Sequence, residues 1–152
     1  MRLIISMATR GRPDRLIDTV KKSVANWTDR NTVMQVQLDA DDDLSVAMAC
    51  RNELSSIDPQ RIVVIVRDRE DTIAAKWNRA VKLDPNADLY LVAADDDPYI
   101  TPGYDSKLLE AAARFPDGIG MVYGHMANAS FSGVVAPTRG LVQKLGGIFP
   151  EY

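Results

Sequence analysis

The chain has 152 residues, of which 46% are hydrophobic, and this length and composition predict one folded domain rather than a disordered protein. Its net charge of −3 argues against a general nucleic-acid-binding protein. No run of about 18 apolar residues occurs, so we expect no membrane-spanning helix.

The first part of the chain predicts two strands and two helices. Residues 3–7 form an apolar run that is typical of a buried strand. A helix is expected over about 13–26, with a proline at its first position. Apolar and polar residues then alternate over 33–38, which predicts a half-exposed strand. This strand leads into the acidic segment 39–43, and a helix is expected over about 45–56.

Cys50 is the only cysteine of the chain and falls on the second predicted helix. A single cysteine excludes an internal disulfide and fits a reducing compartment. Residues 1–7 are too short for a signal peptide and lead directly into charged residues. Together these features favour a cytoplasmic protein. We expect Cys50 to be a small buried residue rather than a nucleophile.

The second part of the chain continues the alternation of strands and helices. Predicted strands cover residues 62–66, 89–94, 119–123 and 132–136, and predicted helices cover about 71–83 and 105–115. The run over 62–66 is β-branched throughout and is expected to be buried. Asp71 or Thr72 is expected to cap the helix over 71–83. Thr138 is expected to cap a last helix that Gly146-Gly147 ends.

Strands that alternate with helices predict an α/β fold, here a single domain over 1–152 with a Rossmann-like, mostly parallel sheet flanked by helices. In such sheets ligands bind beyond the carboxyl ends of the strands. Three turns rich in charged residues fall at these ends, over 9–12, 39–41 and 95–97. Their shared position predicts a binding site there.

Asp95, Asp96 and Asp97 directly follow the apolar strand over 89–94. Three carboxylates this close repel one another, and a bound cation would turn the repulsion into attraction. In an extended chain alternate side chains share a face, so Asp95 and Asp97 are expected to point the same way. Carboxylates without His or Cys nearby suit Mg²⁺ or Mn²⁺. The alternative is a solvated loop that caps the next helix.

The order of these motifs resembles that of the GT-A glycosyltransferases, especially the large family 2 of nucleotide-sugar-dependent enzymes. The likeness spans residues 1 to about 125 and rests on short motifs in a set order. These motifs are Ile4-Ile5-Ser6-Met7-Ala8-Thr9-Arg10-Gly11-Arg12-Pro13, then Asp39, then Ala75-Lys76-Trp77-Asn78-Arg79, then Asp95-Asp96-Asp97 with Pro102-Gly103.

The resemblance implies a nucleoside-diphosphate sugar donor, an unknown acceptor and a divalent metal, Mn²⁺ or Mg²⁺. The residues that it places at the nucleotide are Ala8, Thr9, Arg10, Arg12, Asp39, Lys76, Asp95 and Asp96, and those that it places at the metal are Asp95 and Asp97. Asp39 matches the carboxylate that accepts a hydrogen bond from uracil, which implies a UDP-sugar. Many relatives have proline where this chain has Ala8.

Simpler roles remain open for several of these residues. Asp39 is also suited to capping a helix, and Arg12 and Lys76 are also suited to solvated positions on helices. Trp77 is expected to lie in the core rather than to stack on a ligand.

The catalytic base stays unassigned. Relatives supply it from an acidic motif beyond the segment that corresponds to 147–150, whereas Glu151 is the only carboxylate after Asp117 in this chain. His125, the lone histidine, follows a predicted strand and is another candidate for the base. We therefore expect donor binding, and we leave open a non-catalytic module that holds a nucleotide sugar or a carbohydrate.

The same motifs bear on two other enzyme classes. Leu38-Asp39-Ala40-Asp41 suggests a phosphatase of the haloacid dehalogenase type, but such a motif normally follows the first strand. Sugar-phosphate nucleotidyltransferases share the expected fold, but their glycine-rich signature after the first strand is missing here.

Overall fold

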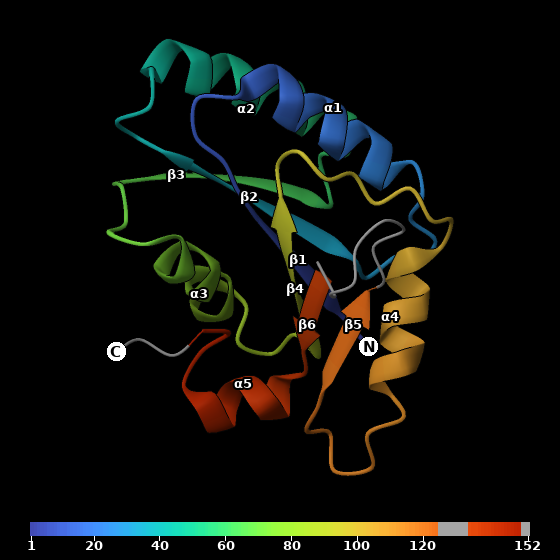
Figure 1. The fold of residues 1–152 in the computed structure, drawn as a ribbon. Coiled ribbons are helices and arrows are strands. Elements are labelled where there is room, and N and C mark those ends of the chain that lie inside the picture. The colour runs from blue at the N-terminus through green and yellow to red at the C-terminus, as the bar shows by residue number, and fades with distance from the viewer. Residues whose placement is uncertain (125–133, 150–152) are drawn as a thin grey trace.

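The computed structural model describes residues 1–124 and 134–149, without the side chains of residues 44–49 and 134. In this part of the chain six strands and five helices follow one another (Figure 1). The strands are β1 (Leu3–Ala8), β2 (Val33–Asp39), β3 (Ile62–Arg67), β4 (Leu89–Ala94), β5 (Met121–Gly124) and β6 (Val134–Pro137). The helices are α1 (Pro13–Val24), α2 (Leu44–Ile57), α3 (Ile73–Leu83), α4 (Tyr104–Ala112) and α5 (Arg139–Leu145).

Four parallel strands form the central sheet, in the order β3-β2-β1-β4. β5 and β6 pair antiparallel as a separate two-stranded ribbon. An antiparallel bridge between Leu89 and Thr138 joins this ribbon to β4. The arrangement confirms the predicted α/β fold with a mostly parallel sheet.

Helices cover both faces of the sheet (Figure 1). Leu3, Ile5 and Met7 of β1 belong to one core, together with buried residues of α1, α2 and α4. Ile4 of β1 and Tyr90 of β4 belong to a second core with residues of α3 and α5. Successive residues of β1 thus alternate between two apolar layers, as the pleat of a strand requires.

The burial of β2 and β3 differs from the prediction. β2 was expected to be half-exposed, yet Gln35 and Gln37 are buried, and Gln37 donates a hydrogen bond to Ser6 Oγ over 2.9 Å. β3 was expected to be buried, yet Val63 is 45% exposed. The cause is strand order, because β2 lies between β1 and β3 while β3 is at the edge of the sheet. Alternation along a sequence does not reveal that order.

The ends of the later elements differ slightly from the expected ranges. α4 ends at Ala112, and β5 begins at Met121. The expected caps are present: the Thr72 hydroxyl accepts from the Ala75 N–H over 3.1 Å, and Thr138 accepts from Leu141. Gly146 then ends α5 with a φ of +80°, a value that glycine adopts without strain. Among the described residues, no helix is long and apolar enough to cross a membrane.

Candidate functional site

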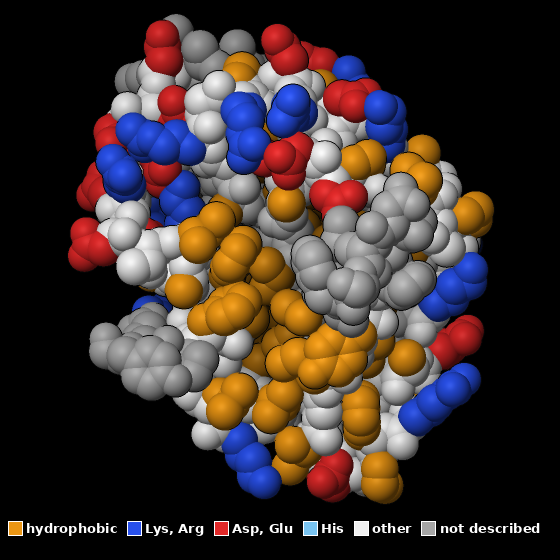
Figure 2. Space-filling model, in the orientation of Figure 1, with side chains coloured by type: hydrophobic (Ala, Val, Ile, Leu, Met, Phe, Trp, Pro, Cys, Tyr) orange, Lys and Arg blue, Asp and Glu red, His pale blue; other side chains and the backbone are white. Residues whose placement is uncertain are grey.

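A cavity lies where the carboxyl ends of the parallel strands meet. Its volume is about 240 Å³. The residues that line it come from the β1–α1 turn, the end of β2, the β3–α3 loop and α3: Ala8, Thr9, Arg10, Arg12, Asp39, Arg69, Glu70, Asp71, Thr72, Ile73 and Lys76. Figure 2 shows charged side chains of both signs gathered on the upper left of the molecule, where several of these strands end in Figure 1. We call this space the Asp39 cavity.

The sequence had pointed to most of this lining. Six of the eight residues expected at a nucleotide line the Asp39 cavity: Ala8, Thr9, Arg10, Arg12, Asp39 and Lys76. Asp95 and Asp96 lie beside it, because Arg12 forms ion pairs with both. Residues 69–73 were not among those expected. They follow the end of β3, and ligands bind beyond the carboxyl ends of parallel strands. That rule predicts the turns after β1, β2 and β4, and it applies equally to the segment after β3.

Asp39 is the buried centre of the cavity lining. Only 2% of the residue is exposed, and its Oδ2 atom lies 2.6 Å from Lys76 Nζ and 3.2 Å from Arg10 Nη1. Its Oδ1 atom is buried and accepts no hydrogen bond from any described residue. A buried carboxylate oxygen without a donor is costly, so this atom favours a ligand that brings an N–H or O–H group.

Two local features fix the cations around Asp39. Thr72 caps α3, which sets Lys76 one turn into that helix with its ammonium group against Asp39. Arg10 precedes Gly11, whose φ of +67° lies in the left-handed region that the turn requires. Arg10 also forms two hydrogen bonds to Asp41, at 2.6 and 3.2 Å.

The contact between Arg10 and Asp41, which are both exposed, shifts the pKa values of both groups. The hydrogen bonds that Arg10 donates to Asp41, and then to Asp39, raise the pKa of the Arg10 guanidinium. In turn the Arg10 guanidinium lowers the pKa of the Asp41 carboxyl. Both groups therefore stay charged near neutral pH, and Arg10 contributes a fixed positive charge to the cavity lining.

The acidic turn after β4 is held by the first turn of the chain. Thr9 Oγ1 donates a short hydrogen bond to Asp95 Oδ2, and Arg12 Nη2 lies 2.6 Å from Asp95 Oδ1. Arg12 Nη1 lies 3.0 Å from Asp96. Thr19 donates to the Asp95 carbonyl over 2.9 Å. These contacts bury Asp95, which is 1% exposed, and bring two of the expected motifs together.

Asp95 and Asp97, which were expected to share a metal, have different surroundings. β4 ends at Ala94 and residues 95–96 form a turn, so the alternation of an extended chain does not reach Asp97. Both carboxylate oxygens of Asp95 are engaged, whereas Asp97 makes no hydrogen bond or ion pair with any described residue. Over the same residues, no group of three or more His, Cys, Asp or Glu side chains is placed to hold a metal.

This arrangement fits a particular kind of metal binding. One free carboxylate leaves most positions around Mg²⁺ or Mn²⁺ for water and for phosphate oxygens. The described residues form no preformed metal cage, and a cation at Asp97 would need most of its ligands from water or from a phosphorylated ligand.

The other residues discussed in the sequence analysis do not line the Asp39 cavity or lie outside the described residues. Trp77 packs against Phe149, with ring centroids 5.2 Å apart, and it does not line the Asp39 cavity. Cys50 is buried in the core, as expected, and burial raises the pKa of its thiol to about 11. His125 and Glu151, the candidates for a catalytic base, lie outside the described residues.

Comparisons with known proteins give matches of structure but not of sequence. No protein-family profile matches the chain, and no curated protein matches it in sequence. Mannosyltransferase PcManGT from Pyrobaculum calidifontis, solved with GDP-Man and Mn²⁺, has a TM-score of 0.79 at 12% identity. The match covers 96% of this chain and 47% of that chain.

Two further structures share the architecture at similar identity. A CMP:2-keto-3-deoxy-manno-octonic acid synthetase complexed with CTP has a TM-score of 0.64 at 14% identity, covering 100% of this chain and 80% of that one. The structure of TarS residues 1–349 from S. aureus has a TM-score of 0.59 at 15% identity, and the match covers 95% of this chain and 49% of that one. The chain thus has the GT-A-like α/β fold of nucleotide-diphospho-sugar transferases, and it spans about half the length of the mannosyltransferase.

Proposed function

We propose that this protein binds a nucleoside-diphosphate sugar in the Asp39 cavity and takes part in transferring the sugar to an acceptor. The observation that carries the proposal is the buried residue Asp39, whose Oδ1 atom has no hydrogen-bond partner among the described residues, in the lining of a cavity at the carboxyl edge of a parallel sheet. Structural neighbours solved with GDP-Man or CTP support a nucleotide as the ligand. A cavity of about 240 Å³ suits a base and ribose, with the rest of the donor extending past its mouth.

Uracil is the base that Asp39 favours. A uracil ring presents an N–H donor, and the Asp39 carboxylate offers an acceptor oxygen that is already buried. A charged acceptor makes a stronger hydrogen bond than a neutral one. Adenine offers no ring N–H on its pairing edge, whereas guanine offers one as uracil does. The match of Asp39 to the carboxylate that accepts from uracil in the family makes a UDP-sugar the proposed donor.

The diphosphate would lie among the cations at the mouth of the cavity. Arg10 and Arg12 approach from the β1–α1 turn, and Arg69 approaches from the β3–α3 loop. Arginine binds phosphate oxygens with two N–H groups at once, which fixes the orientation of the group. Arg12 already neutralises Asp95 and Asp96, so it lowers the repulsion between those carboxylates and the diphosphate.

A divalent cation would be held by Asp97 together with the phosphates, and by Asp95 when Arg12 turns toward the diphosphate. When bound, such a metal supplies Lewis-acid stabilisation of the departing nucleoside diphosphate. The chain's own residues position the nucleotide: Asp39 orients the base, and the arginines orient the phosphates. The sugar acceptor and the group that removes its proton are not assigned.

Two neighbouring arginines provide a matched test. Arg69 and Arg67 are both exposed and belong to the same chain segment, but only Arg69 lines the Asp39 cavity. Arg69→Gln should weaken UDP binding about fivefold, the ~1 kcal/mol of one partly exposed charge contact, whereas Arg67→Gln should leave it unchanged. Amide NMR shifts on titration with UDP and Mg²⁺ should fall at residues 8–12, 39–41 and 69–76. If Arg69→Gln and Arg67→Gln change the affinity for UDP equally, and the amide shifts fall outside residues 8–12, 39–41 and 69–76, the nucleotide does not bind in the Asp39 cavity.

A further inference from the structure

A second cavity lies at the opposite edge of the sheet, where the parallel strands begin. Its volume is about 560 Å³, and it shares no lining residue with the Asp39 cavity. Its walls come from the residue before β1, the α1–β2 loop, the start of β2 and the residues before β3. The side chains that concern its chemistry are Arg2, Trp27, Arg30, Asn31, Gln60 and Arg61.

The charge of this cavity is opposite to that of the whole protein. Arg2, Arg30 and Arg61 line it, and no Asp or Glu is among its described lining residues. The chain as a whole carries a net charge of −3. Arg30 is exposed and makes no hydrogen bond or ion pair with any described residue. Carboxylates outside the lining pair with Arg2 and Arg61, so the charge of Arg30 is the one left for an anion, and the other two guanidinium groups still offer N–H donors.

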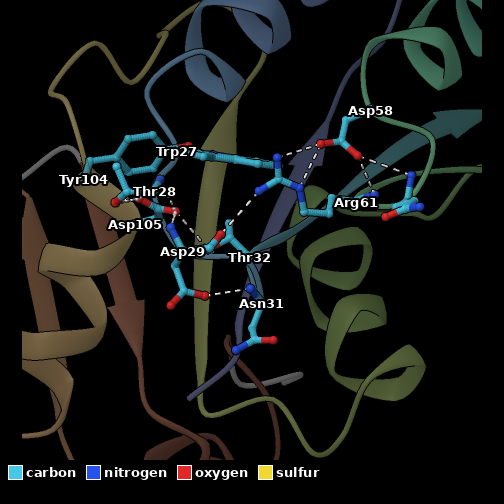
Figure 3. A network of polar contacts seen from close by, with 10 residues as sticks. Trp27, Thr28, Asp29, Asn31, Thr32, Asp58, Arg61, Tyr104 and Asp105 are labelled. Carbon is cyan, nitrogen blue, oxygen red and sulfur yellow. Dashed lines mark hydrogen bonds and ion pairs between the residues drawn. The ribbon is translucent and has the colours of Figure 1, made fainter.

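Arg61 is held rigidly in the wall of this cavity (Figure 3). Its guanidinium lies 5.0 Å from the centre of the Trp27 ring, and Asp58 binds its Nε and Nη2 atoms at 2.8 and 2.7 Å. Nη1 donates to the Asp29 carbonyl over 3.3 Å. Arg2 forms one ion pair with Asp84, at 2.6 Å. Asp58 and Asp84 are not among the lining residues of the cavity. They therefore hold Arg61 and Arg2 in place and leave the cavity open.

The loop that carries Arg30 is itself fastened to α4. Asp105 is fully buried and accepts hydrogen bonds from the backbone N–H groups of Thr28 and Asp29, at 3.0 and 2.8 Å. Trp27 Nε1 donates to the Tyr104 hydroxyl over 2.6 Å. Figure 3 shows these contacts converging on the residues next to Arg30 in the chain. A preorganised loop lowers the entropy cost of binding a ligand.

The rest of the lining supplies neutral polar groups. The amide side chains of Asn31 and Gln60 can donate to and accept from hydroxyl groups. We propose that this cavity is a second ligand site, which takes the phosphate group of a phosphorylated saccharide. The arginines bind the phosphate, and the amides bind the hydroxyl groups of the sugar. The site is independent of the nucleotide proposed for the Asp39 cavity.

The test uses glucose 6-phosphate as the probe and glucose as the uncharged control. Amide NMR titration of the full chain should give shifts at residues 28–33 and 60–61 with glucose 6-phosphate and none with glucose. Arg30→Gln should weaken binding about tenfold, which equals ~1.4 kcal/mol. Arg114→Gln is the matched control, because Arg114 is also exposed, makes no side-chain hydrogen bond or ion pair with described residues and lies outside this cavity. Raised salt should weaken binding.

The other outcomes each overturn part of the inference. Shifts confined to residues 8–12 and 69–76 would place the phosphate in the Asp39 cavity and exclude a second site. Equal affinities of Arg30→Gln and Arg114→Gln would exclude the arginine cluster. Vesicles of phosphatidylcholine with phosphatidic acid form a further arm. Binding to them in an Arg30-dependent way, without binding of glucose 6-phosphate, would assign the phosphate to a lipid headgroup and reject the saccharide.

Discussion

The pairing of Asp39 with Lys76 should dominate the stability of the proposed site. Both side chains are at most 8% exposed, and the ammonium and carboxylate lie 2.6 Å apart. Asp39→Asn keeps the shape of the side chain but leaves Lys76 as a buried cation with no anionic partner among the described residues. Breaking a buried pair in this way typically costs about 3–5 kcal/mol.

Lys76→Met should cost less, because Arg10 remains within 3.2 Å of Asp39 and still compensates its charge. We expect a loss of about 1–3 kcal/mol, the range for one hydrogen bond to a charged group. The double variant Asp39→Asn with Lys76→Met contains no buried ion and should be about as stable as Lys76→Met alone. The two single changes are therefore strongly non-additive.

Urea unfolding of the parent and the three variants measures this coupling directly. For a domain of this size, each kcal/mol lost from the free energy of unfolding lowers the melting temperature by about 2–4 °C. Asp39→Asn should therefore lower the melting temperature by about 6–20 °C. Rescue of Asp39→Asn by Lys76→Met supports the buried pair. Additivity of the two changes within about 0.5 kcal/mol would refute the reasoning, because independent sites behave in that way.

Three other predictions address the metal, the pH dependence and the thiol. Mn²⁺ with UDP at a hundredfold excess over Kd should raise the melting temperature by about 5–10 °C, and Asp97→Asn should remove most of that rise; an unchanged rise would make the acidic turn a solvated loop. Because Arg10 lowers the pKa of Asp41, this carboxyl stabilises the fold above its unfolded pKa of about 4 and loses that contribution as pH falls through the folded pKa. Asp41→Asn should therefore flatten the loss of stability in acid unfolding curves, and identical curves for parent and variant would contradict the pairing. Burial raises the Cys50 pKa to about 11, so iodoacetamide at pH 8 should modify this thiol slowly in the native protein and readily in urea, as mass spectrometry can follow; rapid native reaction would contradict the burial.

The sequence located the edge of the sheet at which the Asp39 cavity lies, but not how its side chains pair. Asp39 and Asp95 could be placed there because the carboxyl ends of parallel strands share an edge. The contacts of Arg12 with Asp95, and of Lys76 with Asp39, join residues that are far apart in the chain. Such pairs depend on strand order and on helix orientation, which no local pattern encodes.

The errors over β2, β3 and the acidic turn have the same origin. Gln35 and Gln37 suggested an exposed face, but a central strand is covered on both sides whatever its polar content. The prediction for Asp95 and Asp97 assumes an extended chain, but the chain turns directly after Ala94. In both cases a local rule was correct for a free strand and was overridden by tertiary position.

Calorimetric titration of the unmodified protein with UDP and with ADP, each with Mn²⁺, tests the central claim most directly. If Asp39 receives the uracil N–H, UDP should bind tighter by about 1.5–3 kcal/mol, the contribution of one hydrogen bond to a charged group. This difference corresponds to roughly tenfold or more in Kd. Equal affinities for the two nucleotides, or tighter binding of ADP, would contradict the assignment of Asp39 as the group that recognises the base.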